Sequence, residues 1–375
     1  MSWKIPLFKI YTDERDIELV SEVIKSGMNW ATGPKVSEFE NIVAEYVGAK
    51  YAVSFNSGTS ALHALLLAYE FGKSDEIIVP SFTFISTANS PLFVGAKPVF
   101  ADIEEKTYGL EPDDVRDKIT QNTKAIMPVH VGGCPCMIKE IKDIADENDI
   151  LLIEDAAESL GSNINGKMVG TYGDAAMYSF CGPKVITTGE GGVIVTESKD
   201  IYEKLKLLRS HGRADTKDYF TTNEYLDYIS LGYNFRMSNI TAALGIAQMG
   251  KISNVIEMRR KNASYMTERL IEEVPSVSTP IEPSGAFHLY QMYTIKAPER
   301  DKLMEFLANK GIMAKVYFPP VHKSYFYKSV LKFQPNLPTT EKMEDCVLTL
   351  PMYPELSESE MNYIIENIKL FYMEN

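Results

Sequence analysis

Cysteine is scarce in this sequence, and its scarcity excludes a protein built on disulfides. Four of the 375 residues are cysteines, and their positions, Cys134, Cys136, Cys181 and Cys346, follow no regular spacing. Cys134 and Cys136 form a close pair, but no second Cys/His pair follows at the spacing of a structural zinc site. We therefore predict neither a disulfide framework nor a bound metal.

The sequence also lacks an excess of positive charge, a long apolar run and the pattern expected of a leader peptide. Acidic residues outnumber Lys and Arg by 51 to 38, which gives a net charge of −13. Nonspecific binding to nucleic acid or to an anionic membrane requires a basic surface, so the charge argues against both. No apolar run is long enough to span a bilayer, and the first residues lack the apolar core and cleavage site of a signal peptide. We expect a soluble, cytoplasmic protein with no nucleic-acid or membrane partner.

The chain is long enough for two domains, and its pattern is that of an α/β protein. Short apolar runs alternate with helical segments from residue 76 to residue 153, which predicts parallel strands covered by helices on both faces. A long helix is expected from residue 239 to about residue 266. We divide the chain within it into a large domain with an N-terminal arm, residues 1–249, and a smaller α/β domain, residues 250–375. The smaller domain is expected to contain strands at 290–295 and 312–317, helices at 301–310 and 357–372, and a loop at 319–338.

A lysine in a glycine-rich connection is the first candidate for chemistry. Lys184 lies between two apolar runs, residues 175–180 and 193–196. Asp155 ends another apolar run, so it lies at the carboxyl end of a predicted strand, where α/β sheets bind ligands. A lysine that forms a Schiff base and an acid that pairs with a pyridinium nitrogen are the two groups that pyridoxal 5'-phosphate (PLP) requires. The alternatives are a surface lysine and a structural helix cap.

The turn after residues 51–55 is a candidate anion site. Asn56-Ser57-Gly58-Thr59 joins this predicted strand to a helix that begins near residue 60. The free amides at a helix start and the helix dipole both favour a bound anion. An ordinary helix cap explains the same residues, but Lys184 and Asp155 in one chain favour a phosphate there.

Six blocks of the sequence, in one order, resemble the DegT/DnrJ/EryC1/StrS family of sugar aminotransferases. The blocks are Trp30…Gly33-Pro34…Phe39-Glu40, Asn56-Ser57-Gly58-Thr59-Ser60-Ala61-Leu62, Pro80-Ser81-Phe82-Thr83-Phe84, Glu154-Asp155-Ala156-Ala157-Glu158 with Ser179-Phe180…Lys184…Thr188-Gly189-Glu190-Gly191-Gly192, Gly232-Tyr233-Asn234-Phe235-Arg236-Met237-Ser238-Asn239, and Leu350-Pro351-Met352-Tyr353-Pro354. The resemblance implies a PLP-dependent transferase of fold type I, with a mostly parallel seven-stranded sheet and a smaller C-terminal α/β domain.

The resemblance also implies a role for each matching residue around the cofactor. Lys184 would form the Schiff base and then move the proton at the substrate carbon, and Asp155 would keep the ring nitrogen protonated. The cofactor phosphate would be held by Gly58, Thr59 and Ser179, and by Asn234 from a second subunit, so the resemblance implies a homodimer with shared active sites.

Further residues match positions around the cofactor ring and the sugar. Phe84 would stack on the cofactor ring and Ala157 would pack beneath it. Glu158 would lie near the phenolic oxygen of the cofactor, and the resemblance defines its role less closely. Residues that match sugar-facing segments of the family, with packing as an equal alternative, are Trp30, Thr32, Tyr317 and His322.

One segment departs from the family pattern. Cys181-Gly182-Pro183 precedes the lysine, where phenylalanine- or asparagine-containing forms are more familiar. Proline fixes the backbone just before Lys184, and this adjusts the reach of the lysine.

The activity implied by the resemblance is transfer of an amino group from L-glutamate to a nucleotide-linked keto sugar, in amino-sugar biosynthesis for surface glycans. A 4-keto-6-deoxy hexose is the expected acceptor, and a 3-keto sugar is the first alternative. PLP-dependent sugar dehydration is a second alternative. Lys184 argues against it, because family members that dehydrate sugars have histidine at the position of this lysine. A third is a PLP-binding regulator without activity, against which Lys184, Asp155 and Asn234 speak together.

Overall fold

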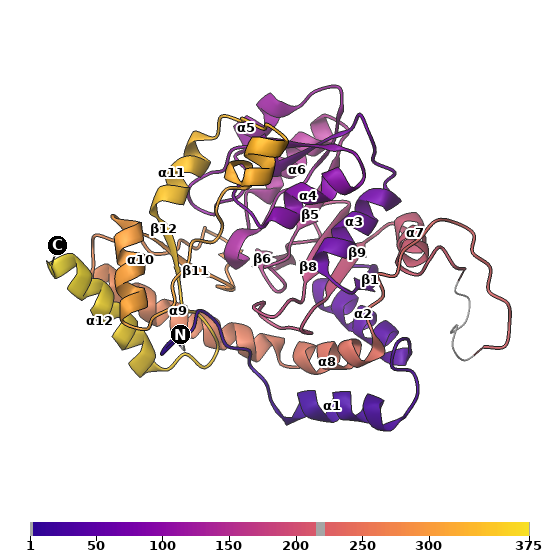
Figure 1. The fold of residues 1–375 in the computed structure, drawn as a ribbon, viewed down its shortest axis with the longest axis horizontal. Helices are drawn as coiled ribbons and strands as arrows, with labels where there is room; N and C mark the ends of the chain where they lie inside the picture. The colour runs from indigo at the N-terminus through magenta and orange to yellow at the C-terminus, as the bar shows by residue number, and fades with distance from the viewer. Residues whose placement is uncertain (1–2, 215–221, 375) are drawn as a thin grey trace.

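The computed structural model describes residues 3–214 and 222–374, and a seven-stranded sheet forms its centre (Figure 1). The strands follow in the order β1-β9-β8-β5-β4-β2-β3. They are β1 (Tyr51–Phe55), β9 (Gly192–Thr196), β8 (Ala175–Ser179), β5 (Leu151–Asp155), β4 (Thr123–Ile126), β2 (Glu76–Pro80) and β3 (Lys97–Ala101). Neighbouring strands run parallel, except that β9 is antiparallel to both β1 and β8. The predicted α/β fold with a mostly parallel seven-stranded sheet is confirmed.

Helices cover both faces of this sheet. Successive side chains of a strand point to opposite faces, and here the side chains on both faces are apolar and must be buried. In β2, Ile77 and Val79 pack with one hydrophobic cluster and Ile78 with another. The first face is covered by α3 (Gly58–Ala68), α4 (Ile85–Phe93) and α7 (Lys199–Arg209). The second face is covered by α2 (Pro34–Val47), α5 (Pro112–Lys118), α6 (Ile138–Glu147) and α8 (Asn239–Met249).

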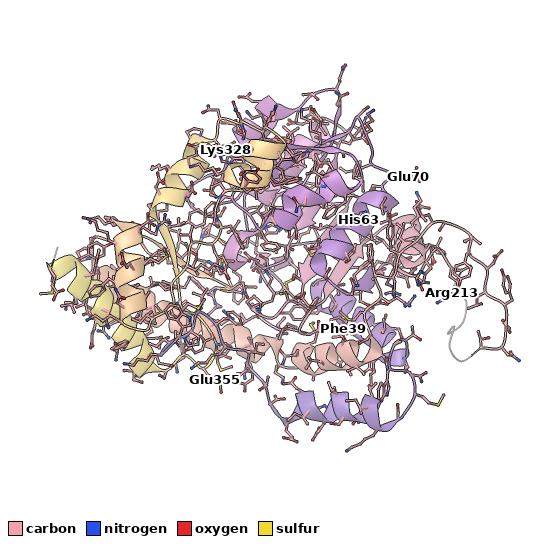
Figure 2. The ribbon with its side chains drawn as sticks, viewed as in Figure 1. Phe39, His63, Glu70, Arg213, Lys328 and Glu355 are labelled. Carbon is pink, nitrogen blue, oxygen red and sulfur yellow. The ribbon has the colours of Figure 1, made fainter. Side chains whose placement is uncertain are left out.

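Close packing fixes the position of α2 against α8. Phe39 of α2, labelled in Figure 2, is fully buried and meets the edge of the Phe180 ring at 5.1 Å between centroids. A Cβ at Gly245 of α8 would lie 2.6 Å from Cε2 of Phe39, so only glycine permits this approach of the two helices. Helix α1 (Glu14–Lys25) packs on the other side of α8 and begins with a capping box, in which Asp13 and Asp16 each accept a backbone amide.

The C-terminal unit has its own hydrophobic core around a two-stranded antiparallel sheet. The strands are β11 (Tyr293–Lys296) and β12 (Val347–Leu350), and the helices that share this core are α9 (Ile252–Glu273), α10 (Arg300–Asn309) and α12 (Glu358–Glu374). Helix α11 (Pro338–Cys346) precedes β12, and its Met343 packs in a separate cluster with Phe82 and Ile103. The N-terminal arm, described from residue 3 to residue 12, joins this unit, since Ile5 is buried in the core of the unit and Lys4 donates its amide to the Gly311 carbonyl at 2.9 Å. Figure 1 shows the arm beside β11 and β12.

Short elements connect these parts. A three-stranded sheet consists of β6 (Asn163–Ile164), β7 (Lys167–Met168) and β10 (Ala286–Phe287), and short helical turns occupy Val131–Gly133, Val321–Lys323 and Phe326–Val330. The polar loop expected at residues 214–228 lies partly outside the described residues. Nowhere in the described ranges does a helix combine the length and the apolar character needed to cross a membrane.

The structure corrects three expected elements. The single helix predicted from residue 239 is two helices, because the chain leaves helical geometry at Lys251 between α8 and α9. The strand predicted at 312–317 is absent, and only isolated bridges from Ile312 to Ile5 and from Lys315 to Thr349 form there. The partner of β11 is instead β12, a strand that the sequence pattern did not reveal.

Helix α9 belongs to both hydrophobic cores. Ile252, Val255 and Ile256 pack with the large sheet, whereas Ala263 and Met266 pack with the C-terminal unit. We retain the two-domain division as a proposal, with α9 as the element that the two domains share.

Candidate active site

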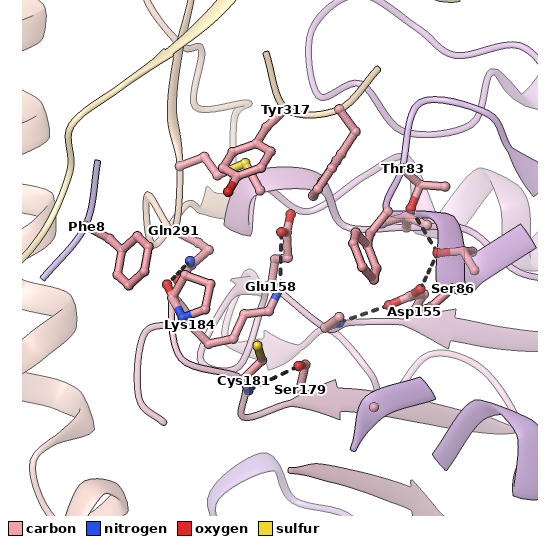
Figure 3. Close-up of a pocket in the computed structure, with 18 of the residues that line it drawn as sticks. Phe8, Thr83, Ser86, Asp155, Glu158, Ser179, Cys181, Lys184, Gln291 and Tyr317 are labelled. Atoms are coloured by element: carbon pink, nitrogen blue, oxygen red, sulfur yellow. Dashed lines mark hydrogen bonds and ion pairs between the residues drawn. The ribbon is translucent and has the colours of Figure 1, made fainter. Parts of the chain in front are cut away.

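A cavity of about 350 Å³ opens where β1, β2, β5 and β8 end. This volume is within the range of small-molecule sites, and the edge is the one at which sheets of mostly parallel strands bind ligands. Loops after the strands form one wall, and residues of the C-terminal unit and the N-terminal arm form the other (Figure 3). Among the described residues that line it, Lys184 is the only basic one.

Asp155 is one of two buried acids of the cavity, together with Glu158, among the described residues that line it. It ends β5 and is 3% exposed. Its Oδ2 accepts from the Thr87 hydroxyl at 2.7 Å and its Oδ1 accepts from the Ala157 amide at 3.1 Å. Burial raises the pKa of Asp155 above its ordinary value, and the hydrogen bonds from Thr87 and Ala157 and the positive charge of Lys184 oppose that rise. A cationic N–H group in the cavity would offset the cost of burying this charge.

Lys184 reaches into the cavity from the loop after β8. Its Nζ donates to Glu158 Oε1 at 3.2 Å, and the Lys184 side chain is 16% exposed. The other carboxylate oxygen of Glu158 accepts the Gly132 amide at 2.8 Å. Glu158 therefore holds the lysine amine at a defined place in the cavity (Figure 3).

The start of α3 lies on the cavity wall and offers free amides that suit an anion. Ser57 caps the helix, and its hydroxyl accepts the Ser60 amide at 3.1 Å. The amides of Gly58 and Thr59 are the first two of the helix, so they have no acceptor within it. A Cβ at Gly192 would lie 2.6 Å from the Ser57 carbonyl oxygen and 2.7 Å from the Gly58 nitrogen, so β9 passes directly beneath this turn. Ser179, at the end of β8, adds a hydroxyl to the same wall.

Aromatic side chains line the remainder of the cavity. Phe84 is 58% exposed although it is large and apolar, and its ring lies 6.0 Å from that of Phe318. Tyr317 lies across the cavity in Figure 3, and Phe8 of the N-terminal arm contributes a third ring. Exposed aromatic rings in a pocket suit a flat or sugar-like ligand, which can stack on them.

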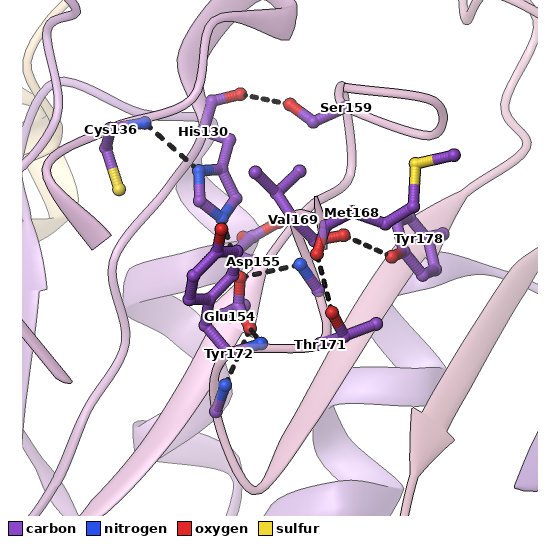
Figure 4. Close-up of polar contacts among 12 residues, drawn as sticks. His130, Cys136, Glu154, Asp155, Ser159, Met168, Val169, Thr171, Tyr172 and Tyr178 are labelled. Carbon is purple, nitrogen blue, oxygen red and sulfur yellow. Dashed lines mark hydrogen bonds and ion pairs between the residues drawn. The ribbon is translucent and has the colours of Figure 1, made fainter. Parts of the chain in front are cut away.

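Glu154, next to Asp155, is a buried carboxylate with a structural task (Figure 4). Its oxygens accept the amides of Gly170, Tyr172 and Gly173 at 2.6–2.8 Å and contact His130 Nε2 at 3.0 Å. The Cys136 amide donates to His130 Nδ1 at 3.2 Å, so the ring donates from Nε2, which points to Glu154. This network fixes the end of β5, and with it the direction of Asp155.

The structure brings most of the predicted site residues together. Those that line the cavity are Gly58, Thr59, Phe84, Asp155, Ala157, Glu158, Ser179, Lys184 and Tyr317.

The other predicted site residues do not line the cavity of this chain. Asn234 is exposed, and its carbonyl lies 3.5 Å from the Asn56 amide group. Trp30 is half exposed in the loop before α2, and Thr32 is in the same loop. His322 is buried, with Nδ1 2.7 Å from the Ser81 hydroxyl and Nε2 3.4 Å from Glu341, which favours the packing alternative for this residue.

Several lining residues had no signal in the sequence. Leu7 and Phe8 come from the N-terminal arm, Thr87 from α4, and Gln291 and Met292 from the segment before β11. Only their position in the folded chain places them here. Met352, in contrast, lies in one of the blocks that resemble the family.

The cavity fits PLP by the chemistry of its groups. It combines a reactive amine, a buried carboxylate of raised pKa, a helix start that suits a phosphate and an exposed aromatic ring. Each of these groups matches a different part of the cofactor.

The family model of the DegT/DnrJ/EryC1/StrS aminotransferase family matches residues 11–369.

The chain belongs to this family.

Similar proteins agree with this assignment. A GDP-perosamine synthase of Escherichia coli O157:H7 is 36% identical and the alignment covers 98% of each chain. A pleiotropic regulatory protein of Geobacillus stearothermophilus is 38% identical over 95% of this chain and 94% of its own. The structure of PseC of Helicobacter pylori, an aminotransferase involved in pseudoaminic acid biosynthesis, superposes with a TM-score of 0.92 at 28% identity, over 100% of both chains.

The predicted family and enzyme class are therefore confirmed. This DegT/DnrJ/EryC1/StrS protein is a sugar aminotransferase of the PLP-dependent class. Its cavity lies at the ends of the parallel strands, where α/β sheets bind ligands.

Proposed function

We propose that this enzyme binds PLP and transfers the amino group of L-glutamate to a nucleotide-linked 4-keto-6-deoxy sugar, in the biosynthesis of an amino sugar for surface polysaccharide. The observation that carries the proposal is the convergence of Lys184, Asp155 and the start of α3 on one cavity. The similarity to GDP-perosamine synthases supports a GDP-linked sugar among the possible acceptors. A 3-keto sugar is the alternative acceptor.

The residues that would hold PLP are those of the cavity wall. Gly58, Thr59 and Ser179 would bind its phosphate, Phe84 and Ala157 would lie against its ring, and the Asp155 carboxylate would pair with its ring nitrogen. The bound cofactor supplies a carbonyl that carries the amino group and a ring that accepts electrons.

Lys184 is the proton carrier of the proposed reaction. When neutral, its amine removes a proton from the carbon that bears the nitrogen of glutamate, and it returns a proton to the former keto carbon of the sugar. Glu158 accepts a hydrogen bond from Nζ and stabilises the amine when it is charged. Asp155 keeps a proton on the ring nitrogen, because its buried carboxylate gains most from a cationic partner.

A homodimer with shared sites is part of the proposal. Asn234 does not line the cavity of its own chain, and it follows a surface segment with large exposed apolar side chains. Tyr225 is 84% exposed and Leu231 is 80% exposed. Exposed apolar residues gathered in one segment favour burial against a second copy, which would carry Asn234 to the partner's phosphate site.

The name of one relative favours a second candidate function, a PLP-binding regulator. A regulator needs the cofactor in place but not the ability to exchange amino groups. The Lys184 amine, held within reach of the cavity by Glu158, favours the enzyme.

A spectral titration tests the proposal. The PLP-loaded protein is mixed with L-glutamate, and the visible absorption of the bound cofactor is followed. GDP-, UDP- and dTDP-linked 4-keto and 3-keto sugars are then added one at a time. We expect glutamate to bleach the band and one 4-keto-6-deoxy sugar to restore it.

Each other outcome points to a different alternative. Restoration by a 3-keto sugar alone would select the alternative acceptor. A stable band that glutamate does not alter, even at high concentration and with other amino acids, would favour the regulator. The Lys184→Ala variant is the control, since it lacks the amine that moves the proton and should convert none of these sugars into its amino form.

A further inference from the structure

Gln291 makes one hydrogen bond to the loop that carries Lys184. This glutamine lines the cavity, is 8% exposed, and donates from Nε2 to the Pro183 carbonyl at 2.6 Å. We propose that Gln291 is a positioning residue, which holds the backbone next to Lys184 so that the amine acts from one place. The inference rests on the proposed function of Lys184.

The orientation of the Gln291 amide follows from its partner. If the amide were turned over, Oε1 would lie against the Pro183 carbonyl oxygen, and two acceptors would repel each other. With Nε2 toward Pro183, Oε1 is buried and has no hydrogen-bond partner among the described residues. A buried amide oxygen without a donor destabilises the fold, so a methionine of similar length would serve packing better. Compared with methionine, the glutamine at position 291 therefore adds one useful feature, the Nε2 donor that binds the Pro183 carbonyl.

The main chain of Gln291 is itself held firmly. Arg259 of α9, fully buried, donates from Nη1 to the carbonyls of Tyr290, Gln291 and Met352 at 3.1–3.3 Å. This guanidinium joins the segment before β11 to the segment after β12. The backbone that carries the Gln291 side chain is therefore fixed, which limits where its amide group can lie.

A chain of contacts that starts from Gln291 and its neighbour Met292 surrounds the lysine. Figure 3 shows Gln291 beside the backbone next to Lys184, and Glu158 beside the lysine side chain. The Met292 amide donates to the Gly132 carbonyl at 3.0 Å, and the Gly132 amide donates to Glu158 at 2.8 Å. Glu158 then accepts from Lys184 Nζ, whose backbone follows Pro183, the partner of Gln291. The chain of contacts therefore fixes the lysine at its side-chain end and at its backbone end from one segment of the C-terminal unit.

Two substitutions separate the donor of Gln291 from its acceptor. Gln291→Met removes both and keeps the length of the side chain. Gln291→Glu keeps an oxygen in place of Oε1 but sets a carboxylate against the Pro183 carbonyl. A matched control is Asn262→Leu, because Asn262 is also a buried amide that donates to the carbonyls of Tyr353 and Pro354, at 3.0 and 3.1 Å, away from the cavity.

The readout is the reactivity of the Lys184 amine. Each cofactor-free, full-length protein is mixed with PLP, and samples taken over time are trapped with borohydride. Mass spectrometry then gives the fraction of modified Lys184 peptide. We expect trapping to slow about 10- to 100-fold in Gln291→Met, because small displacements of a reacting group cost rates of this size. Gln291→Glu should be slower still, and Asn262→Leu should match the wild type.

Thermal unfolding and steady-state kinetics complete the test. The unfolding temperature of Gln291→Met should stay near that of the wild type, whereas Asn262→Leu should unfold at a lower temperature. In the aminotransferase assay, Gln291→Met should lower kcat and leave the KM for glutamate nearly unchanged.

Three results would overturn the inference. Trapping at the wild-type rate in both Gln291 variants would show that the hydrogen bond to Pro183 does not matter. A normal rate in Gln291→Glu with a slow Gln291→Met would assign the role to the oxygen instead of the donor. If wild-type Lys184 is never trapped, the proposed function fails, and the inference fails with it.

Discussion

Replacing Asp155 by asparagine should stabilise the cofactor-free protein and weaken its hold on PLP. The substitution keeps the shape of the side chain and removes its charge. The local hydrogen bonds survive: the Ala157 amide still donates to the oxygen, and the new amide group donates to the Thr87 hydroxyl. Thr87 then turns its proton to Thr83, whose hydroxyl oxygen is 2.9 Å away. The main change is the loss of a buried negative charge.

The effect on stability depends on pH in a definite direction. Burial raises the pKa of Asp155 above its ordinary value of 3.8, so the native protein binds this proton more tightly than the unfolded chain does. The free energy of unfolding therefore falls as pH rises from 3.8 to the raised pKa, by at most about 1.4 kcal/mol per pH unit. Asp155→Asn lacks this slope. For a chain of 375 residues, each kcal/mol corresponds to about 1–2 °C in unfolding temperature.

The effect on the cofactor has the opposite sign. A hydrogen bond to a charged partner contributes about 1.5–3 kcal/mol, so its loss should weaken PLP binding roughly 10- to 100-fold. The aminotransferase rate should fall further, because a neutral amide does not keep the ring nitrogen protonated. Thermal unfolding of cofactor-free protein between pH 4 and pH 8 and an absorption titration with PLP measure the two effects separately.

Glu154→Gln is the matched control, a neighbouring buried carboxylate changed in the same way. Glu154 accepts from Gly170, Tyr172, Gly173 and His130, so an amide group there would face donors. Two donors would lose their acceptor, and the protein should lose about 2–5 kcal/mol. The reasoning is refuted if Asp155→Asn lowers stability at neutral pH as Glu154→Gln does, or if it binds PLP with unchanged affinity.

The remaining predictions concern the lysine, the proposed phosphate site at the start of α3, and the site shared between subunits. Lys184→Ala should fold normally and should abolish both the visible band of lysine-bound PLP and amino transfer; a retained band would remove this role from Lys184. Gly192→Ala should lower PLP affinity at least tenfold and stability by about 1–3 kcal/mol, because its Cβ meets Ser57 and Gly58 at 2.6–2.7 Å; Gly72→Ala, where a Cβ meets nothing within 4 Å, is the control for both measurements. Asn234→Ala should weaken PLP binding, and mixing its subunits with those of Lys184→Ala should restore part of the activity; a monomer in sedimentation would contradict the shared site.

The sequence predicted the parts of the site that are built from local patterns. Asp155 ends a strand and Lys184 follows one, and the rule that ligands bind at strand ends is enough to bring them to one edge of the sheet. The helix start that we propose for the phosphate was predictable as a turn for the same reason, since Ser57 and Gly58 join a strand directly to a helix and need no distant residues to do so.

The remaining parts depend on contacts between distant segments. Phe8 and Gln291 line the cavity only because the arm and the C-terminal unit pack together. The break between α8 and α9 escaped prediction because helix-compatible residues continue on both sides of Gly250. Strand β12 follows α11 without a loop, so the sequence contains no turn residues that would indicate where the strand begins. For His322 the resemblance left a sugar contact and packing as equal alternatives, and the turn Val321–Lys323 directs its ring toward Ser81, as packing would.

The N-terminal arm has a practical consequence for anyone who purifies this enzyme. Leu7 and Phe8 belong to the cavity wall, and the Met352 amide donates to the Leu7 carbonyl at 3.1 Å, so the arm is seated between the pocket and the C-terminal unit. An affinity tag fused ahead of residue 3 would disturb the contacts of the arm with the cavity and the C-terminal unit. The end of α12, in contrast, lies at the outer edge of the molecule (Figure 1). Recombinant protein for kinetic work should carry its tag after α12.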